Sequence, residues 1–194
     1  MIKKYAGVFF SLIMCWFFLV EASTSIEIRG AAFFPASHRF REVYENIGGN
    51  YQVELSTSTC ICQREFNLWA NFDWYSKKNK KHDCCDYYTR VEIPTISGGL
   101  KYYFPCTCFC SNFDFYLGLG VTYSRIHLKS ESCCVKEKKC KDSIGGVIKS
   151  GINYYFCRNF FLDVFVDYVY QPVSFHKHVD VGGLKVGGGL GYSF

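Results

Sequence analysis

Residues 181–194 read VGGLKVGGGLGYSF, and this stretch decides the fold of the chain. Large apolar side chains stand on alternate positions, namely Leu184, Val186, Leu190, Tyr192 and Phe194. Small or polar residues stand between them: Gly183, Lys185, Gly187, Gly189, Gly191 and Ser193. Because successive side chains of a strand point to opposite faces, this period of two predicts a β-strand with one oily face.

Seven earlier segments alternate in the same way, so that the expected strands cover 25–35, 50–59, 65–76, 89–104, 112–125, 144–156, 160–171 and 182–194. In the fifth segment, Phe113, Leu117 and Val121 share one face with three other apolar residues. The segments exceed the roughly 5 or 6 residues of a soluble strand, and eight is the smallest common number of strands in a membrane barrel. We therefore predict an all-β fold, an eight-stranded antiparallel transmembrane β-barrel with an up-and-down meander.

The connections between these segments alternate in length. Short connections at 60–64, 105–111 and 157–159 alternate with longer ones at 36–49, 77–88, 126–143 and 172–181. This asymmetry is typical of barrels with short periplasmic turns and long outer loops. In the first long connection, Ser37 is a candidate cap for a short helix whose apolar face holds Phe40, Val43, Tyr44 and Ile47. Such a helix would cover the barrel mouth, lie at the lipid interface or bind a partner.

The fourth segment breaks the alternation. Val91 and Ile93 stand on odd positions, whereas Leu100, Tyr102 and Phe104 stand on even ones. A β-bulge at Gly98-Gly99 would account for this change.

Residues 1–22 have the features of a secretory signal peptide. Lys3 and Lys4 precede an uncharged, mostly apolar stretch, and Val20-Glu21-Ala22 offers a cleavage site after Ala22. A retained membrane anchor is the alternative, although the apolar run is shorter than the ~20 residues of a spanning helix. The expected barrel domain then covers residues 23–194.

These features resemble the small eight-stranded outer-membrane barrels, the family that contains the membrane domain of outer membrane protein A. The resemblance rests on the signal peptide, the eight segments and Tyr192-Ser193-Phe194, which is similar to the C-terminal signal read by the barrel-assembly machinery. It implies a location in the bacterial outer membrane, with outer-membrane lipid and the assembly machinery as partners. A secreted barrel of the lipocalin kind, with its oily face inward, is the alternative.

With the apolar faces assigned to lipid, the charged residues of the strands point into the lumen. They are Glu27, Arg29, Glu54, Asp73, Arg90, Glu92, Lys101, Asp114, Lys149, Asp163, Asp167 and Lys185. In so narrow a barrel these charges must pair or hold trapped water. They predict either a plug of salt bridges or a narrow, gated ion path that favours cations.

The cysteines depart from this family, whose typical members have few or none. The chain has twelve, and those after Cys15 fall at turns and loops: Cys60, Cys62, Cys84, Cys85, Cys106, Cys108, Cys110, Cys133, Cys134, Cys140 and Cys157. Export to an oxidising compartment favours disulfides, and an odd number suggests a bond to another chain or a free thiol. The pattern resembles envelope proteins of obligate intracellular bacteria that are cross-linked by disulfides, which implies other cysteine-rich envelope proteins as partners. A metal site is the competing interpretation, but the Cys-x-Cys and Cys-Cys spacings are poor zinc signals.

The lysine runs, the net charge and the lack of a catalytic set bear on the function. Two expected outer loops carry runs of lysine, Lys77 to Lys81 and Lys136 to Lys141, which would attract lipopolysaccharide phosphates or host glycans or would simply be solvated. The net charge of +5 is modest and does not favour nucleic acid. No nucleophile, histidine and acid can be grouped into a catalytic set, so we predict no enzyme, no cofactor and no metal site. The predicted role is structural, with an adhesin or a narrow pore as alternatives.

Overall fold

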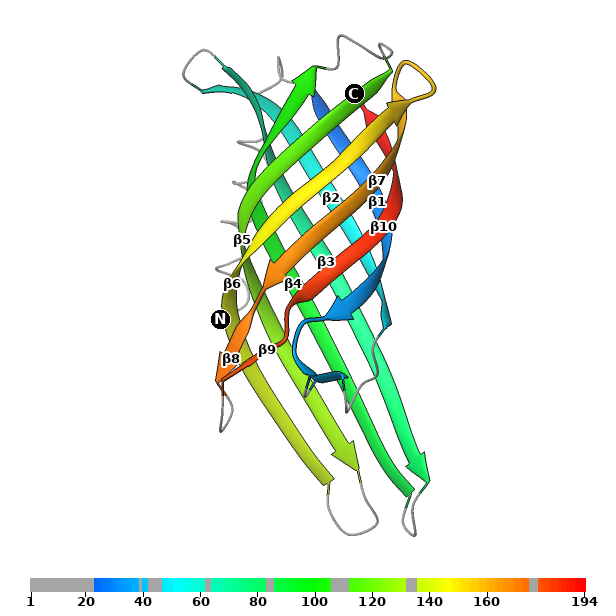
Figure 1. Cartoon of the computed structure of the whole chain (residues 1–194), viewed down its shortest axis with the longest axis vertical. Coiled ribbons are helices and arrows are strands. Elements are labelled where there is room, and N and C mark those ends of the chain that lie inside the picture. Colours follow the sequence, from blue (N-terminus) through cyan, green and yellow to red (C-terminus); the bar gives the residue numbers. More distant parts are fainter. Residues whose placement is uncertain are drawn as a thin grey trace, which may run out of the picture.

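The computed structural model describes residues 23–38, 40–41, 47–61, 64–82, 86–105, 112–131, 136–174 and 178–194, and almost all of them belong to β-strands (Figure 1). The strands are β1 (Thr24–Pro35), β2 (Gly48–Ile61), β3 (Arg64–His82), β4 (Asp86–Pro105), β5 (Phe113–Glu131), β6 (Lys136–Tyr155), β7 (Phe160–Tyr170), β8 (Pro172–Ser174), β9 (His178–Asp180) and β10 (Gly183–Ser193).

Eight of these strands form a closed barrel in the order β1-β10-β7-β6-β5-β4-β3-β2, and β8 and β9 form a separate small hairpin. Every strand of the barrel pairs antiparallel with its neighbours in the chain. The seam between β1 and β10 runs from Ser25↔Ser193 to Pro35↔Gly183. The closed sheet leaves no unpaired edge along this seam. The predicted eight-stranded up-and-down barrel is therefore confirmed.

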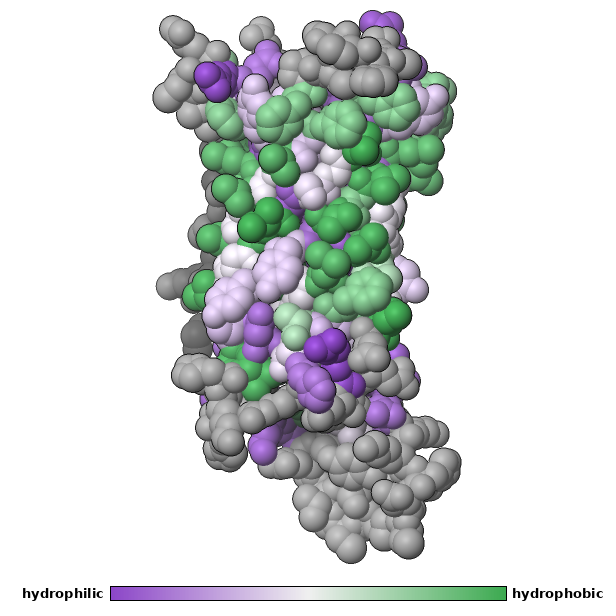
Figure 2. Space-filling view, viewed as in Figure 1, coloured by the Kyte–Doolittle hydropathy of each residue, from purple (hydrophilic) through white to green (hydrophobic). Residues whose placement is uncertain are grey.

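The outside of the barrel is apolar, and its inside is largely polar. On β7, Leu162, Val164 and Val166 are exposed, whereas Asp163 and Asp167, on the alternate positions, are buried. Exposed apolar side chains of the other strands continue this surface, and on the face shown in Figure 2 they form a broad band across the barrel. An outward apolar band around a polar interior is the arrangement of a barrel that faces lipid, so the lipocalin alternative is wrong.

Aromatic side chains gather at the end of the barrel where the chain turns tightly. Their ring centroids lie 4.8 Å apart for Phe113 and Tyr154, 4.9 Å for Phe160 and Tyr192, and 5.0 Å for Tyr192 and Phe194. Aromatic girdles of this kind mark the interfaces of membrane barrels.

At the other end, β3 to β6 project beyond the remaining strands as two long hairpins (Figure 1). Pairing of β3 with β4 continues to His82↔Asp86, and pairing of β5 with β6 continues to Glu131↔Lys136. The expectation that 77–88 and 126–143 are loops is therefore wrong for most of their length. The apolar alternation that identified the strands ends near the membrane, whereas the backbone hydrogen bonds that hold a hairpin do not depend on it.

An apolar cluster lies inside the mouth of the barrel, at the level where β3, β4 and β5 begin to project. This mouth cluster contains Phe33, Phe40, Tyr75, Val91, Ile93, Ile126, Val173 and Val181. Phe40, from the expected helix of the first long connection, packs into the cluster, whereas residues 42–46 lie outside the described part of the chain.

The ladder between β3 and β4 is unbroken from Asn67↔Lys101 to His82↔Asp86, so the predicted bulge at Gly98-Gly99 is wrong.

Candidate functional site

The interior of the barrel contains a layer of buried charges. Nine of the charges expected in the lumen are at least nine-tenths buried: Glu27, Arg29, Glu54, Asp73, Lys101, Lys149, Asp163, Asp167 and Lys185. They come from seven strands, and the inward parity of each strand brings them together. Since buried charges are tolerated only when they are paired, the geometry of their contacts decides what this layer does.

Arg29 lies at the centre of this layer. Its Nε is 2.8 Å from Glu27 Oε1, its Nη2 is 2.9 Å from Asp163 Oδ2, and its Nη1 is 3.3 Å from Glu54 Oε2 and 3.8 Å from Asp167 Oδ2. Nη2 also donates a hydrogen bond to the hydroxyl of Tyr116. One guanidinium thus joins β1, β2, β5 and β7 across the lumen, which the planar fork of arginine donors allows.

Glu54 is the carboxylate that links Arg29 to the two buried lysines. Lys101 contacts Glu54 Oε1, and Lys149 contacts Oε2. Lys149 Nζ is also 3.5 Å from Asp167 Oδ2. The ammonium groups lie over aromatic rings as well, 4.4 Å from the ring centroid of Tyr116 for Lys101 and 4.6 Å from that of Trp69 for Lys149. These contacts hold the cations in place from more than one side.

Inward-facing glycines make room for these long side chains. A Cβ on Gly118 would lie 2.9 Å from Lys101 Cγ, and a Cβ on Gly189 would lie 2.9 Å from Arg29 Cγ. The glycines that the sequence places opposite the apolar face therefore provide volume for the charged layer.

A second polar layer lies on the side of the mouth. Lys185 Nζ is 2.8 Å from Asp73 Oδ2, and Asn50 donates to the other oxygen of Asp73. Gln52 donates to Asn50, and Asn71 donates to Gln52. Sequence reasoning missed these amides, as it missed Trp69 and Tyr116, because it searched only for charges. Their inward parity is the signal that could have identified them.

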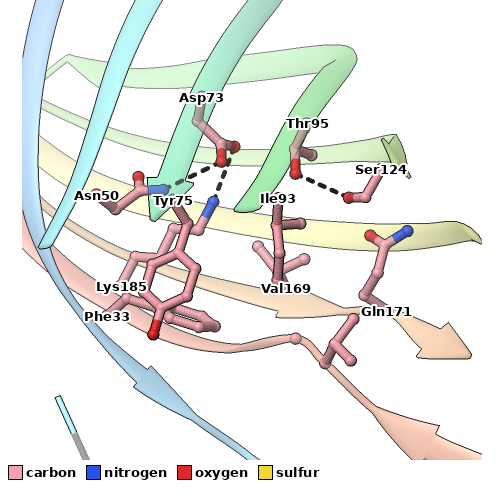
Figure 3. A pocket seen from close by; sticks show the side chains of 12 residues that line it. Phe33, Asn50, Asp73, Tyr75, Ile93, Thr95, Ser124, Val169, Gln171 and Lys185 are labelled. Atoms are coloured by element: carbon pink, nitrogen blue, oxygen red, sulfur yellow. Dashed lines mark hydrogen bonds and ion pairs between the residues drawn. The ribbon is translucent and has the colours of Figure 1, made fainter. Parts of the chain in front are cut away.

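Between this second layer and the mouth cluster lies a cavity of about 20 Å³ (Figure 3). Lys185 and Asp73 line its polar side, and Phe33 and Ile93 line its apolar side. Thr95 and Ser124 form a hydrogen bond of 2.8 Å at its wall. This volume is about that of one water molecule.

Three of the charges expected in the lumen lie elsewhere. Arg90 and Glu92 do not face the lumen: they are on the outer face of β4, opposite the buried Val91 and Ile93, and they pair with each other. Their assignment was wrong because the apolar side of β4 changes from outward to inward near the mouth. Asp114 has the inward parity of β5 but lies at the end of that strand and is only half-buried.

Three cysteines fall within the described residues, and all three are free and exposed: Cys60, Cys140 and Cys157. Cys60 lies near the end of β2 and Cys157 in the connection between β6 and β7, whereas Cys140 lies on the projecting part of β6. Cys140 Sγ is 3.4 Å from Nδ1 of His127 on the neighbouring strand. The other disulfide candidates lie outside the described residues: Cys62, Cys84, Cys85, Cys106, Cys108, Cys110, Cys133 and Cys134.

Within the described ranges, no group of three His, Cys, Asp or Glu side chains could hold a metal ion. The same ranges contain no helix long and apolar enough to cross a membrane.

No protein-family model and no curated protein sequence matches the chain. Solved structures do match. The attachment invasion locus protein Ail of Yersinia pestis, in complex with the heparin analogue sucrose octasulfate, is similar with a TM-score of 0.60 and 14% identity over 89% of this chain and 99% of Ail. The outer membrane protein OprG of Pseudomonas aeruginosa matches with a TM-score of 0.59 and 15% identity, over 89% and 96% of the two chains. The fold is that of the small outer-membrane β-barrels.

A third match extends this likeness to the N-terminal barrel domain of Pseudomonas aeruginosa OprF. Its TM-score is 0.54 and its identity 17%, over 89% of this chain and 97% of that domain. At such low identity, the shared property is the barrel fold itself.

The last two aromatic residues of the chain lie at the seam of this fold. The Phe194 amide donates to the carbonyl oxygen of Thr24 at 2.8 Å, and the Ser193 amide donates to that of Asn159 at 2.7 Å. Tyr192 and Phe194 are therefore placed beside both neighbours of β10. Their role as a signal for barrel assembly stays a prediction.

Proposed function

We propose that the chain is a bacterial outer-membrane barrel with a structural role in the envelope, joined to neighbouring envelope proteins by disulfides. In this proposal residues 1–22 are removed as a signal peptide, and Tyr192 and Phe194 are read by the barrel-assembly machinery. The apolar band and the likeness to solved outer-membrane barrels support the location. The exposed free cysteines support the cross-linking.

The position of these cysteines is the observation that carries the proposal. Cys60 and Cys157 lie at the end of the barrel that carries the tight turns, and Cys140 lies on the projecting hairpin at the opposite end. None of these thiols is enclosed by the barrel, so each is accessible to another protein. In an oxidising compartment such thiols form disulfides with partner thiols.

Non-reducing gels of isolated envelopes test the cross-linking. The wild-type chain should migrate in high-mass bands that collapse to the monomer when a reductant is added. A Cys60→Ser, Cys157→Ser variant and a separate Cys140→Ser variant should each lose a different set of bands. A monomer band that is unchanged without reductant would refute the cross-linking.

The location needs its own measurement, so that the two parts of the proposal can fail separately. Envelopes separated into inner and outer membranes should show the chain in the outer fraction. The folded barrel should migrate anomalously in detergent gels until it is boiled. A chain released into the periplasm or the medium would refute the location without reference to its cysteines.

A second candidate function is binding at the cell surface, as in an adhesin. The projecting hairpins support it, because they carry the lysine runs beyond the apolar band as one continuous four-stranded sheet. Ail, which shares this fold, was solved with a heparin analogue. Attachment to host cells should fall when lysines of the projecting sheet are exchanged for glutamate, and unchanged attachment would refute this function.

The pore, the remaining alternative, has the least support. In the described interior, the lumen is crossed by the ion pairs of Arg29 and Glu54 and closed toward the mouth by the mouth cluster. A hydrated ion path needs a continuous lining, whereas this interior is packed with side chains. Planar-bilayer recording of the refolded barrel should give no conductance steps, and steady channel openings would restore the pore.

A further inference from the structure

The register of the projecting sheet places four cations side by side. Lys78 on β3 pairs with Arg90 on β4, Arg90 pairs with Lys129 on β5, and Lys129 pairs with Lys138 on β6. Their positions have the parity of the outward face on each strand, the same face that carries Trp74, Ile96, Tyr123 and Ile144 nearer the membrane. We call these four residues the cation row.

The cation row is a concentrated line of charge. Neighbouring strands are about 4.8 Å apart, so four residues in register span about 14 Å across the sheet. Like charges placed directly opposite each other are unfavourable unless an anion lies between them. Arg90 has such a partner in Glu92, while Lys78, Lys129 and Lys138 are exposed to solvent. The row thus keeps an excess of positive charge that a ligand can neutralise.

The height of the cation row above the membrane narrows the choice of ligand. Lys78 is four residues beyond Trp74, and Lys138 is six residues from Ile144, the outermost exposed apolar positions of β3 and β6. At about 3.3 Å per residue and a strand tilt of about 40°, the row stands roughly 10–15 Å above the apolar band. The headgroup layer on each side of a bilayer is only about 5–7 Å thick. The row therefore lies above the phosphates of a phospholipid headgroup layer, and the lipopolysaccharide vesicles in the test below separate it from phosphates that stand higher.

The residues beside the cation row narrow the choice of ligand further. Ser76, Glu92, His127 and Cys140 form the adjacent row on the membrane side, again through cross-strand pairing. These two rows offer no aromatic ring on which a nucleic-acid base could stack, and the next row outward, Lys80, Tyr88, Glu131 and Lys136, offers one. A line of separate, exposed cations suits a chain of singly charged groups better than one compact anion, which needs donors that converge on a point.

We propose that the cation row binds a linear sulfated polysaccharide that lies across the strands, with its sulfate groups on Lys78, Arg90, Lys129 and Lys138. This inference rests on the surface-binding function proposed above and names its site and its ligand class. Lys139 and Lys141 have the opposite parity on β6 and lie outside the site, although they carry the same charge.

The test uses the mature chain refolded in lipid nanodiscs, with fluorescent sulfated dextran as the probe and unsulfated dextran as the control ligand. Lys129→Gln, Lys138→Gln removes two charges from the row, and Lys139→Gln, Lys141→Gln removes two from the opposite face of the same hairpin. At low salt, the first variant should bind sulfated dextran at least about 10-fold more weakly. Its salt dependence should also fall by roughly two counterions. The second variant should stay within about 3-fold of wild type.

Equal losses in both variants would overturn the cation row as the site, because they would indicate a diffuse effect of net charge. Equal binding of unsulfated dextran would overturn the ligand class, and so would preferential binding of lipopolysaccharide vesicles. A parallel host-cell attachment assay separates the two proposals. Attachment that both variants retain in full overturns the cation row alone, whereas a wild-type protein that attaches no better than an empty-vector control overturns the surface-binding function itself.

Discussion

Neutralising Glu54 is the most direct perturbation of the charged interior, because three buried cations share its carboxylate. At an effective dielectric constant of about 20, the pair of Arg29 and Glu54, 3.3 Å apart, attracts by about 5 kcal/mol. Lys101 and Lys149 add attractions of the same kind. Desolvation offsets part of this energy, and the removal of one partner from a buried ion pair costs about 3–5 kcal/mol. We expect Glu54→Gln to lower the free energy of unfolding by that amount.

The assay is denaturant unfolding of the barrel in lipid vesicles, followed by tryptophan fluorescence. Trp69 is a suitable reporter because it is buried beside Lys149. Glu65→Gln is the matched control, since Glu65 is exposed on β3, and it should change the unfolding free energy by less than about 0.5 kcal/mol. Adding Lys101→Met to Glu54→Gln removes a cation that has lost its partner and should recover at least about 1 kcal/mol.

A Glu54→Gln variant whose free energy of unfolding is within about 1 kcal/mol of wild type would refute the reasoning. Neutralising a desolvated carboxylate with three cationic partners should destabilise the barrel by more than that. A double variant less stable than Glu54→Gln would show instead that Lys101 is held by its aromatic neighbour rather than by the carboxylate.

Three further predictions use the same protein. Gly187→Ala should destabilise the barrel by about 1–3 kcal/mol, because its Cβ would lie 2.0 Å from the carbonyl oxygen of Gly30 across the seam; the matched Gly30→Ala has open space and should be neutral in the same unfolding assay. Phe33→Ala should cost about 3–5 kcal/mol by opening a cavity in the mouth cluster, and a loss below about 1 kcal/mol would mean that the cluster is not packed. On the projecting hairpin, the hydrogen bond from Arg125 Nε, 2.9 Å long, lowers the pKa of Asp142. The pair therefore stabilises the hairpin above the ordinary pKa of aspartate, and this contribution is lost as the pH falls through the lowered pKa. An NMR titration should show the pKa of Asp142 rising toward its ordinary value of about 3.9 in Arg125→Met, and an unchanged pKa would contradict the assignment.

The sequence was sufficient for the barrel because alternation is a local property that each strand carries in its own residues. The same alternation gives Glu54 and Arg29 an inward position. It could not predict that Arg29 meets Asp163, because these residues come together only when the sheet closes. The amides of the second layer, such as Gln52, were missed for a related reason. A neutral polar residue opposite an apolar one is compatible with either lumen or solvent, so its parity alone does not identify a network.

The change of apolar face along β4 marks the level at which the strands leave the apolar band. Side-chain parity never changes: Ile96 points outward and is exposed, and Ile93 points inward and is buried. What changes is the surroundings, since near the mouth the interior is apolar and the outside polar.

The two neighbouring strands change at the same level. On β5 the change falls between the exposed Tyr123 and the buried Ile126, and Tyr123 pairs with Ile96. On β3 it falls between Trp74 and Tyr75, and Tyr75 pairs with Ile93. A bulge would shift the register of one strand alone, whereas a boundary between two solvents must cross all of them at paired positions. The break in alternation that suggested a bulge at Gly98-Gly99 therefore marks the residues at which β4 passes from the lipid layer into water.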